Sequence, residues 1–168
     1  MSKFDYSLDY ENLNFRDRPE LYRVGKGEQG VLLVQPYKSE ILPYWRFKTP
    51  EIATESSHKI YQLFLEYLEQ NDFVGADMAR KFLQMGYTRS RRYANHKSGK
   101  KYRINPQQAE SPRAEKEAHK DVLPLDLDPV KAKSAEIFKL KWHEAQANSK
   151  YQQLLRLHQQ KYHNSNGT

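Results

Sequence analysis

Apolar residues recur every three or four positions from about residue 50 onward, the spacing of one face of an α-helix. We predict helices over residues 50–70 and 73–85. Thr49 and Asp72 precede these segments and are residue types that cap the first turn of a helix. Gly86 is predicted to end the second helix, because glycine is common just after a helix C-terminus.

The N-terminal third has a different pattern, with two short apolar runs on either side of a glycine-rich stretch. Residues 21–24 and 31–35 are mostly apolar, and the stretch 25–30 between them contains three glycines. Because glycine permits the positive φ angles of a tight reversal, we predict a β-hairpin here. Residues 40–47 are predicted to add a short strand, with Pro43 keeping it at the sheet edge.

Residues 1–20 carry regularly placed aromatic side chains. Phe4, Tyr6, Leu8 and Tyr10 alternate with polar residues, which is the period of a strand. An edge strand and an extended arm with its rings in surface grooves both fit this pattern. We favour the arm, because aspartate and asparagine are poor strand formers.

The remaining segments complete the predicted architecture. We expect a short third helix over 89–96, a long loop or mobile segment at about 98–128, and two C-terminal helices that begin after Asp128 and near Ser149. The tail 163–168 is expected to be disordered. The predicted fold class is therefore α+β, a small antiparallel N-terminal sheet or hairpin packed on a helical bundle with the C-terminal helices. Residues 21–162 would form one domain behind an N-terminal arm at 1–20.

Composition indicates a modest core in a polar chain. Of the 168 residues, 38% are hydrophobic, and 12 tyrosines, seven phenylalanines and two tryptophans supply much of the apolar area. The chain has no cysteine, which excludes disulfides and thiolate metal sites and is typical of the reducing cytoplasm. No apolar run approaches the roughly 20 residues of a membrane-spanning helix. We expect a cytoplasmic protein without a membrane partner.

The positive charge is concentrated in one block. The chain has 28 lysines and arginines against 21 acidic residues, and nine of these cations lie between residues 80 and 103. The rest of the chain has 19 lysines and arginines and 21 acidic residues, so this block accounts for the net positive charge. Cations neutralise phosphates with release of counterions, and aromatic faces stack on bases. The predicted polyanion-binding residues are Arg89, Arg91, Arg92, His96, Lys97, Lys100 and Lys101, with Tyr87, Tyr93 and Tyr102 and with Lys26 of the glycine-rich stretch.

Other interpretations of these residues stay open. The same cations could pair with the chain's own carboxylates, such as Glu66, Glu69 and Asp77, and form a solvated basic face. A helix-turn-helix would place Arg89, Arg92 and His96 on one side of its recognition helix. Against that motif, the bulky Phe82 stands four residues before the turn glycine.

The glycines at 25, 27 and 30 match the spacing G-x-G-x-x-G. The dinucleotide-binding version of this motif requires a helix after the glycines, whereas the residues that follow here are strand-like. A hairpin tip is therefore the favoured interpretation, and phosphate contact through Lys26 remains open. The chain has no P-loop and no G-x-S-x-G elbow, and no histidine pair has zinc-site spacing. We predict no cofactor and no metal.

Two alternatives to nucleic-acid binding follow from other residues. The first is a protein-interaction module in which the C-terminal helices dock a protein partner or form a homodimer. The second is a small enzyme acting on a phosphorylated substrate, which we favour less than a non-enzymatic role. The docking stripe would contain Ala135, Phe138, Trp142, Tyr151, Leu154 and Leu155. The enzyme pocket would contain Lys26, Arg46, Arg89, Arg92, His96 and Tyr93, with Asp77 as a base.

Long stretches of the chain resemble a known family. Pro19 to Leu32, Trp45 to Pro50 and Met78 to Lys101 resemble a domain-of-unknown-function family of small proteins from bacteria and tailed phages. The resemblance covers residues 4–162 and implies one compact domain that includes the C-terminal helices. It implies no catalytic residue, cofactor or partner.

Overall fold

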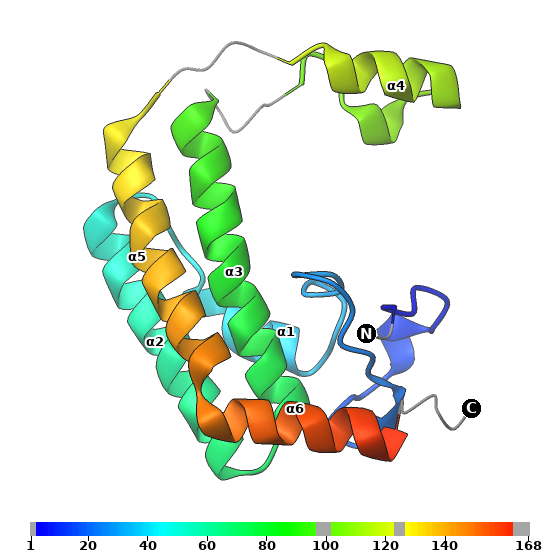
Figure 1. Ribbon diagram of the computed structural model, residues 1–168, viewed down its shortest axis with the longest axis vertical. Coiled ribbons are helices and arrows are strands. Elements are labelled where there is room, and N and C mark those ends of the chain that lie inside the picture. The colour runs from blue at the N-terminus through cyan, green and yellow to red at the C-terminus, as the bar shows by residue number, and fades with distance from the viewer. Residues whose placement is uncertain (1–2, 97–101, 123–126, 163–168) are drawn as a thin grey trace.

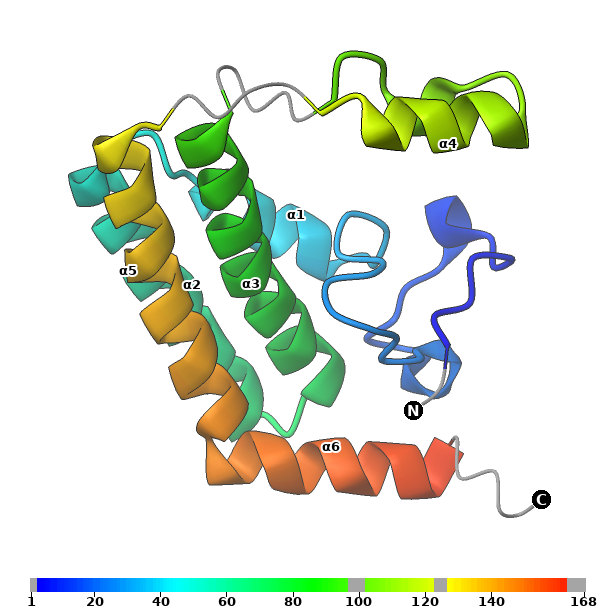
Figure 2. The ribbon, with the colours of Figure 1, turned by 45° about the horizontal axis from the view of Figure 1, so that its top comes forward.

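Three long helices form the body of the computed structural model (Figure 1). They are α2 (Pro50–Glu69), α3 (Phe73–Asn95) and α5 (Pro129–Ala147), which pack against one another along their lengths (Figure 2). Each begins where the sequence predicts. Thr49 accepts a hydrogen bond from the amide of Ile52, and Asp72 and Asp128 cap α3 and α5 in the same way. The structure describes residues 3–96, 102–122 and 127–162.

The predicted N-terminal sheet is wrong. Within the residues that the structure describes there is no strand, and the single isolated bridge pairs Tyr102 with Val122. The N-terminal third instead contains the 3-10 helices η1 (Tyr10–Asn12) and η2 (Pro19–Leu21) and a series of turns. The described part of the chain is all-helical rather than α+β.

Glycine geometry and buried cations explain why no hairpin forms. Gly25, Gly27 and Gly30 all have positive φ, at 71°, 61° and 81°. Three such reversals within six residues coil the backbone into a loop, which we call the glycine loop (residues 25–30). The carbonyls of Val24 and Gln29 accept hydrogen bonds from a lysine of α3, so they have no need of a paired strand.

The residues after the glycine loop also turn rather than extend. Val31 and Val34 are buried while Leu32 and Leu33 between them are exposed, which is a spacing of three and not the alternation of a strand. The predicted third strand is replaced by α1 (Tyr37–Ile41) and the 3-10 helix η3 (Leu42–Tyr44).

The first residues cover the core with aromatic rings. The ring of Tyr10 stacks between those of Phe4 and Phe15, with centroids 5.6 and 5.7 Å away. Phe4 also fills the space beside Gly30, where an added Cβ would lie 2.1 Å from its ring. A side chain at residue 30 would displace Phe4 from the core.

The predicted end of the second helix at Gly86 is also wrong, because α3 continues to Asn95. An added Cβ at Gly86 would lie 2.2 Å from the Phe138 ring of α5. Glycine is therefore needed here for the close approach of two helices and not for a turn. The continuous helix removes both the separate helix over 89–96 and the helix-turn-helix that depended on it.

The rest of the chain adds three helical segments. The 3-10 helix η5 (Pro106–Gln108) and α4 (Pro112–Lys120) pack together, set apart from the three long helices in both views (Figures 1 and 2). They occupy part of the region, residues 98–128, that was expected to be a loop. α6 (Ser149–Tyr162) follows the predicted break and crosses the end of the bundle. Among the described helices, none combines the length and the apolar character needed to cross a bilayer.

Candidate functional site

One face of α3 carries polar residues from Asp77 to Asn95. Positions at alternating spacings of four and three share a helix face. The N-terminal half of this face lies under the glycine loop, because residues of both halves of that loop hydrogen-bond to it. The residues of the face are Asp77, Lys81, Gln84, Thr88, Arg91 and Asn95, with Arg80 and Arg92 beside them.

Asp77 is the centre of the covered half. Its carboxylate is fully buried and lies 2.7 Å from Nη2 of Arg80. It also accepts hydrogen bonds from the hydroxyls of Tyr22 and Tyr151. Arg80 in turn donates to the carbonyl of Gly27 at 2.8 Å. This carboxylate is therefore fully engaged inside the fold.

Lys81 is the second buried cation of this half. Its Nζ donates to the carbonyls of Val24 and Gln29 at 2.5 and 2.6 Å and lies 3.9 Å from Asp77. Burial lowers the pKa of Lys81 to about 8, with the attraction of Asp77 opposing part of that shift. The two cations fasten the glycine loop to α3.

The nine cations of the basic block thus differ in their surroundings. Arg80 and Lys81 are buried against Asp77, and Arg103 forms a 3.2 Å ion pair with Asp121. Across the described ranges, no carboxylate lies within ion-pair distance of the three arginines in the C-terminal half of α3, which are Arg89, Arg91 and Arg92. Lys97, Lys100 and Lys101 lie outside the described residues.

Glu28 of the glycine loop is a carboxylate that interacts electrostatically with Arg89 and Arg92. Thr88 donates a hydrogen bond to it at 3.0 Å. Burial raises the pKa of Glu28, while the Thr88 hydrogen bond and the positive charges of Arg89 and Arg92 oppose that rise. The protein's own Glu28 therefore offsets part, but not all, of the positive charge of these arginines.

A pocket of about 270 Å³ lies on this half of α3. Four of the predicted site residues line it, together with Thr88 and Asn95. Among its lining side chains His96 is buried, Arg91 is partly exposed and Arg92 is exposed. The four predicted residues that the structure brings together here are Tyr87, Arg91, Arg92 and His96.

The other predicted residues lie elsewhere. Arg89 is on the neighbouring side of α3, and Lys26 is exposed on the glycine loop. The Tyr93 ring packs on Phe47, 5.7 Å between centroids. Tyr102 lies in the η5–α4 region, with its ring 5.4 Å from that of His119. Tyr93 and Tyr102 are thus separate from the pocket.

Tyr87 lines the pocket but is also used in packing. Its ring stacks on Trp142 of α5, with centroids 5.7 Å apart, and Nζ of Lys139 lies 5.6 Å from its centroid. Because Trp142 occupies one face of this ring, that face is closed to a nucleobase. Any contact of this surface with an anionic partner would therefore depend mainly on its cations.

Thr88, Asn95 and Glu28 are site residues that the sequence analysis missed. The spacing of Gln84, Thr88, Arg91 and Asn95 would have identified the first two, once α3 is taken as continuous. Nothing in the local sequence places Glu28 there, because its contact with Thr88 joins residues 60 positions apart.

The predicted enzyme pocket does not assemble around Asp77. Its carboxylate is fully buried, and Arg80, Tyr22 and Tyr151 occupy it. It is therefore not available as a general base for a substrate on the exposed half of α3. Within the described segments, no three histidine or acidic side chains are grouped in a way that could hold a metal ion.

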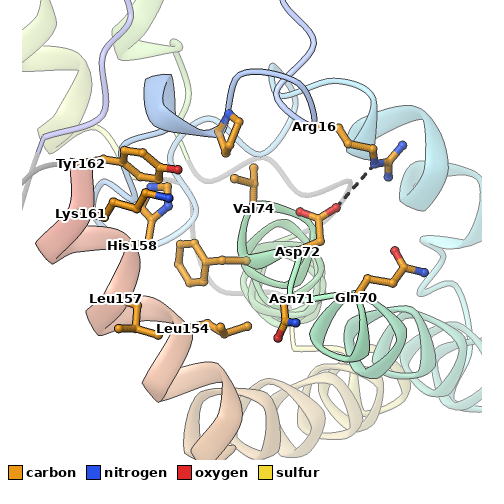
Figure 3. Close-up of a pocket in the computed structure, with 12 residues that line it drawn as sticks. Arg16, Gln70, Asn71, Asp72, Val74, Leu154, Leu157, His158, Lys161 and Tyr162 are labelled. Carbon is orange, nitrogen blue, oxygen red and sulfur yellow. Dashed lines mark ion pairs between the residues drawn. The ribbon is translucent and has the colours of Figure 1, made fainter.

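A second hollow, of about 410 Å³, lies at the opposite end of α3 (Figure 3). The side chains of Val74, Leu154 and Leu157 are among its apolar lining. Asp72 lies at its edge, 3.6 Å from Nε of Arg16, and also accepts from Tyr37 and from the α3 amide of Gly75. The charges here hold the N-terminal segment to the start of α3, so this hollow is a structural junction.

Half of the predicted docking stripe of the C-terminal helices lies inside the molecule, and the other half is partly buried. Ala135, Phe138 and Tyr151 are buried in the core. The three other side chains of the stripe, Trp142, Leu154 and Leu155, are partly buried and pack against that core.

Over its described residues, the protein is all-helical and has a basic face on its central helix. The chain matches the model of the domain of unknown function DUF4385 over residues 5–161, and it belongs to this family. The predicted family resemblance is thereby confirmed, while the origin in bacteria or tailed phages stays a prediction. No curated protein and no solved structure matches the chain.

Proposed function

We propose that this protein binds nucleic acid through the C-terminal half of α3, without catalysing a reaction and with little sequence specificity. The observation that supports the proposal is that the basic block contains both buried, paired cations and cations without an ion-pair partner in the described part of the chain. The fold buries Arg80 and Lys81 beside Asp77 and leaves Arg89, Arg91 and Arg92 without an ion-pair partner among the described residues.

These three cations are arranged for contact with a backbone of phosphates. Arg91 and Arg92 line an open pocket, and Arg89 lies on the adjoining side of the same helix. Lys26 is exposed on the glycine loop, which contacts α3 at Gln84 and Thr88. A planar guanidinium binds phosphate through two parallel hydrogen bonds, so arginines are well suited to this role.

We further propose that the protein acts in the cytoplasm. The cysteine-free composition supports a reducing compartment, where nucleic acid is accessible to a protein of this kind.

The proposal is tested by the binding of fluorescein-labelled single-stranded and double-stranded oligonucleotides, measured by fluorescence anisotropy. The variant R89Q/R91Q/R92Q removes three charges from the proposed surface. The matched control R23Q/K150Q/R156Q removes three exposed charges from α6 and from the segment next to it. We expect a loss of affinity of at least about tenfold in the first variant and little change in the second. Equal affinities of the two variants would contradict the proposal.

A further inference from the structure

The pocket beside Arg91 differs from the rest of the basic surface, because it is concave and lined by polar groups. Its volume of about 270 Å³ lies just below the usual range of sites for drug-sized ligands, which begins at roughly 300 Å³. A single phosphate with its ribose is therefore a better match than a larger molecule.

Three side chains of this pocket offer hydrogen-bond donors in a short segment of α3. Arg91 and Arg92 supply guanidinium groups without an ion-pair partner in the described residues. Asn95 is one helical turn beyond Arg91 on the same face, and its amide adds a neutral donor. No carboxylate lines this pocket.

His96 supplies the independent observation. The residue is only 6% exposed, and its Nδ1 atom is buried without a hydrogen-bond partner. Buried polar atoms nearly always have a partner in native proteins, and one without a partner is costly. An imidazole nitrogen carrying its proton donates to an anionic oxygen, which would give this atom the partner that the described residues do not provide.

We propose that this pocket binds the terminal phosphate of a nucleic-acid strand. A phosphomonoester carries up to two negative charges and three terminal oxygens, whereas a phosphodiester within a strand carries one charge and two such oxygens. The monoester therefore satisfies Arg91, Arg92 and His96 together. This inference rests on the proposed function, since the strand behind the phosphate would follow the surface of Arg89.

The test compares three single strands of one sequence, phosphorylated at the 5′ end, at the 3′ end, or at neither. Binding is measured by competition against a labelled strand. We expect one phosphorylated strand to bind about tenfold more tightly than the unphosphorylated strand, the effect of one or two hydrogen bonds to a charged group. In H96A and in N95A, each measured separately, this ratio should fall below about threefold, and a ratio that stays at the wild-type value in both variants would overturn the inference.

K26Q is the matched control, because Lys26 is outside the pocket. It should weaken all three strands by the same factor and leave their ratio unchanged. If the wild-type protein binds all three strands equally, the terminal-phosphate site is overturned and the proposed function stands. If it binds none of them, the proposed function falls, and this inference with it. A phosphorylated peptide that displaces the strands better than the phosphorylated strand would also overturn the inference.

Discussion

Arg80 and Asp77 form a 2.7 Å ion pair in the interior of the protein, one helical turn apart on α3. The pair is part of a network that reaches three other parts of the chain. Tyr22 comes from the N-terminal segment, Tyr151 from α6, and the carbonyl of Gly27 from the glycine loop. The network holds these parts on the central helix and removes two cations from the basic surface.

Asp77→Asn is therefore expected to destabilise the protein. The substitution leaves Arg80 and Lys81 as buried cations without a counter-charge, a loss of about 3–5 kcal/mol in comparable buried pairs. Urea denaturation followed by circular dichroism measures the free energy of unfolding. Asp121→Asn is the control, since the ion pair of Asp121 with Arg103 is solvent-exposed, and it should cost less than about 1 kcal/mol. Equal effects of the two substitutions would contradict the central place of Asp77.

Stability should also decline in acid through the same carboxylate. Burial tends to raise the pKa of Asp77, but Arg80 and Lys81, with hydrogen bonds from two tyrosines, outweigh it and lower that pKa below 3.8. A carboxyl group with a lowered pKa in the folded state contributes stability above its unfolded value, and this stability is lost as pH falls toward the folded value.

The measurement is the melting temperature of the wild-type protein and of D77N between about pH 6 and pH 2. The difference between the two proteins should be largest at the upper end of this range and shrink below the unfolded pKa of 3.8. Parallel curves over the whole range would show that Asp77 does not supply this stability.

Gly86→Ala tests the contact between α3 and α5. The added methyl group would lie 2.2 Å from the Phe138 ring, so one helix must move. We expect a loss of about 1–3 kcal/mol, although alanine is otherwise the better helix former. In a double-mutant cycle, F138L should reduce the effect of G86A by making space. Additive effects of the two substitutions would show that this contact does not limit the packing.

Glu28→Gln should strengthen anion binding. The carboxylate is held by Thr88 and offsets part of the charge of Arg89 and Arg92. Its neutralisation is expected to raise the affinity for oligonucleotides about two- to fivefold, a gain typical of a partly screened pair. Glu69→Gln, at the exposed C-terminal end of α2, removes the same charge elsewhere and should have a smaller effect. Equal gains would mean that only net charge matters.

The sequence predicted the helices well where the signal was local. The caps Thr49, Asp72 and Asp128 stand directly before α2, α3 and α5, and each forms the expected hydrogen bond. The same local reasoning failed at the glycine loop. The carbonyls of Val24, just before this loop, and of Gln29 within it accept hydrogen bonds from Lys81, 57 and 52 positions later, and no short-range pattern distinguishes that arrangement from a hairpin.

The candidate surface was predicted only in part, because some of its features also depend on contacts between residues far apart in the sequence. Counting charges located the basic block and named Arg91, Arg92 and His96, which the structure brings to one pocket. Counting does not show which cations are buried, and only the structure shows that Asp77 holds Arg80 and Lys81 in the interior. Gly86 was misinterpreted because its role depends on Phe138, which approaches it only in the folded bundle.

The dependence of nucleic-acid affinity on salt tests the central claim most directly. The logarithm of the association constant should fall linearly with the logarithm of the salt concentration, by roughly 0.7–0.9 for each phosphate neutralised. R89Q/R91Q/R92Q should reduce this slope by about two, whereas R23Q/K150Q/R156Q should leave it unchanged. An unaltered slope in the first variant would contradict the assignment of phosphate contacts to the C-terminal half of α3.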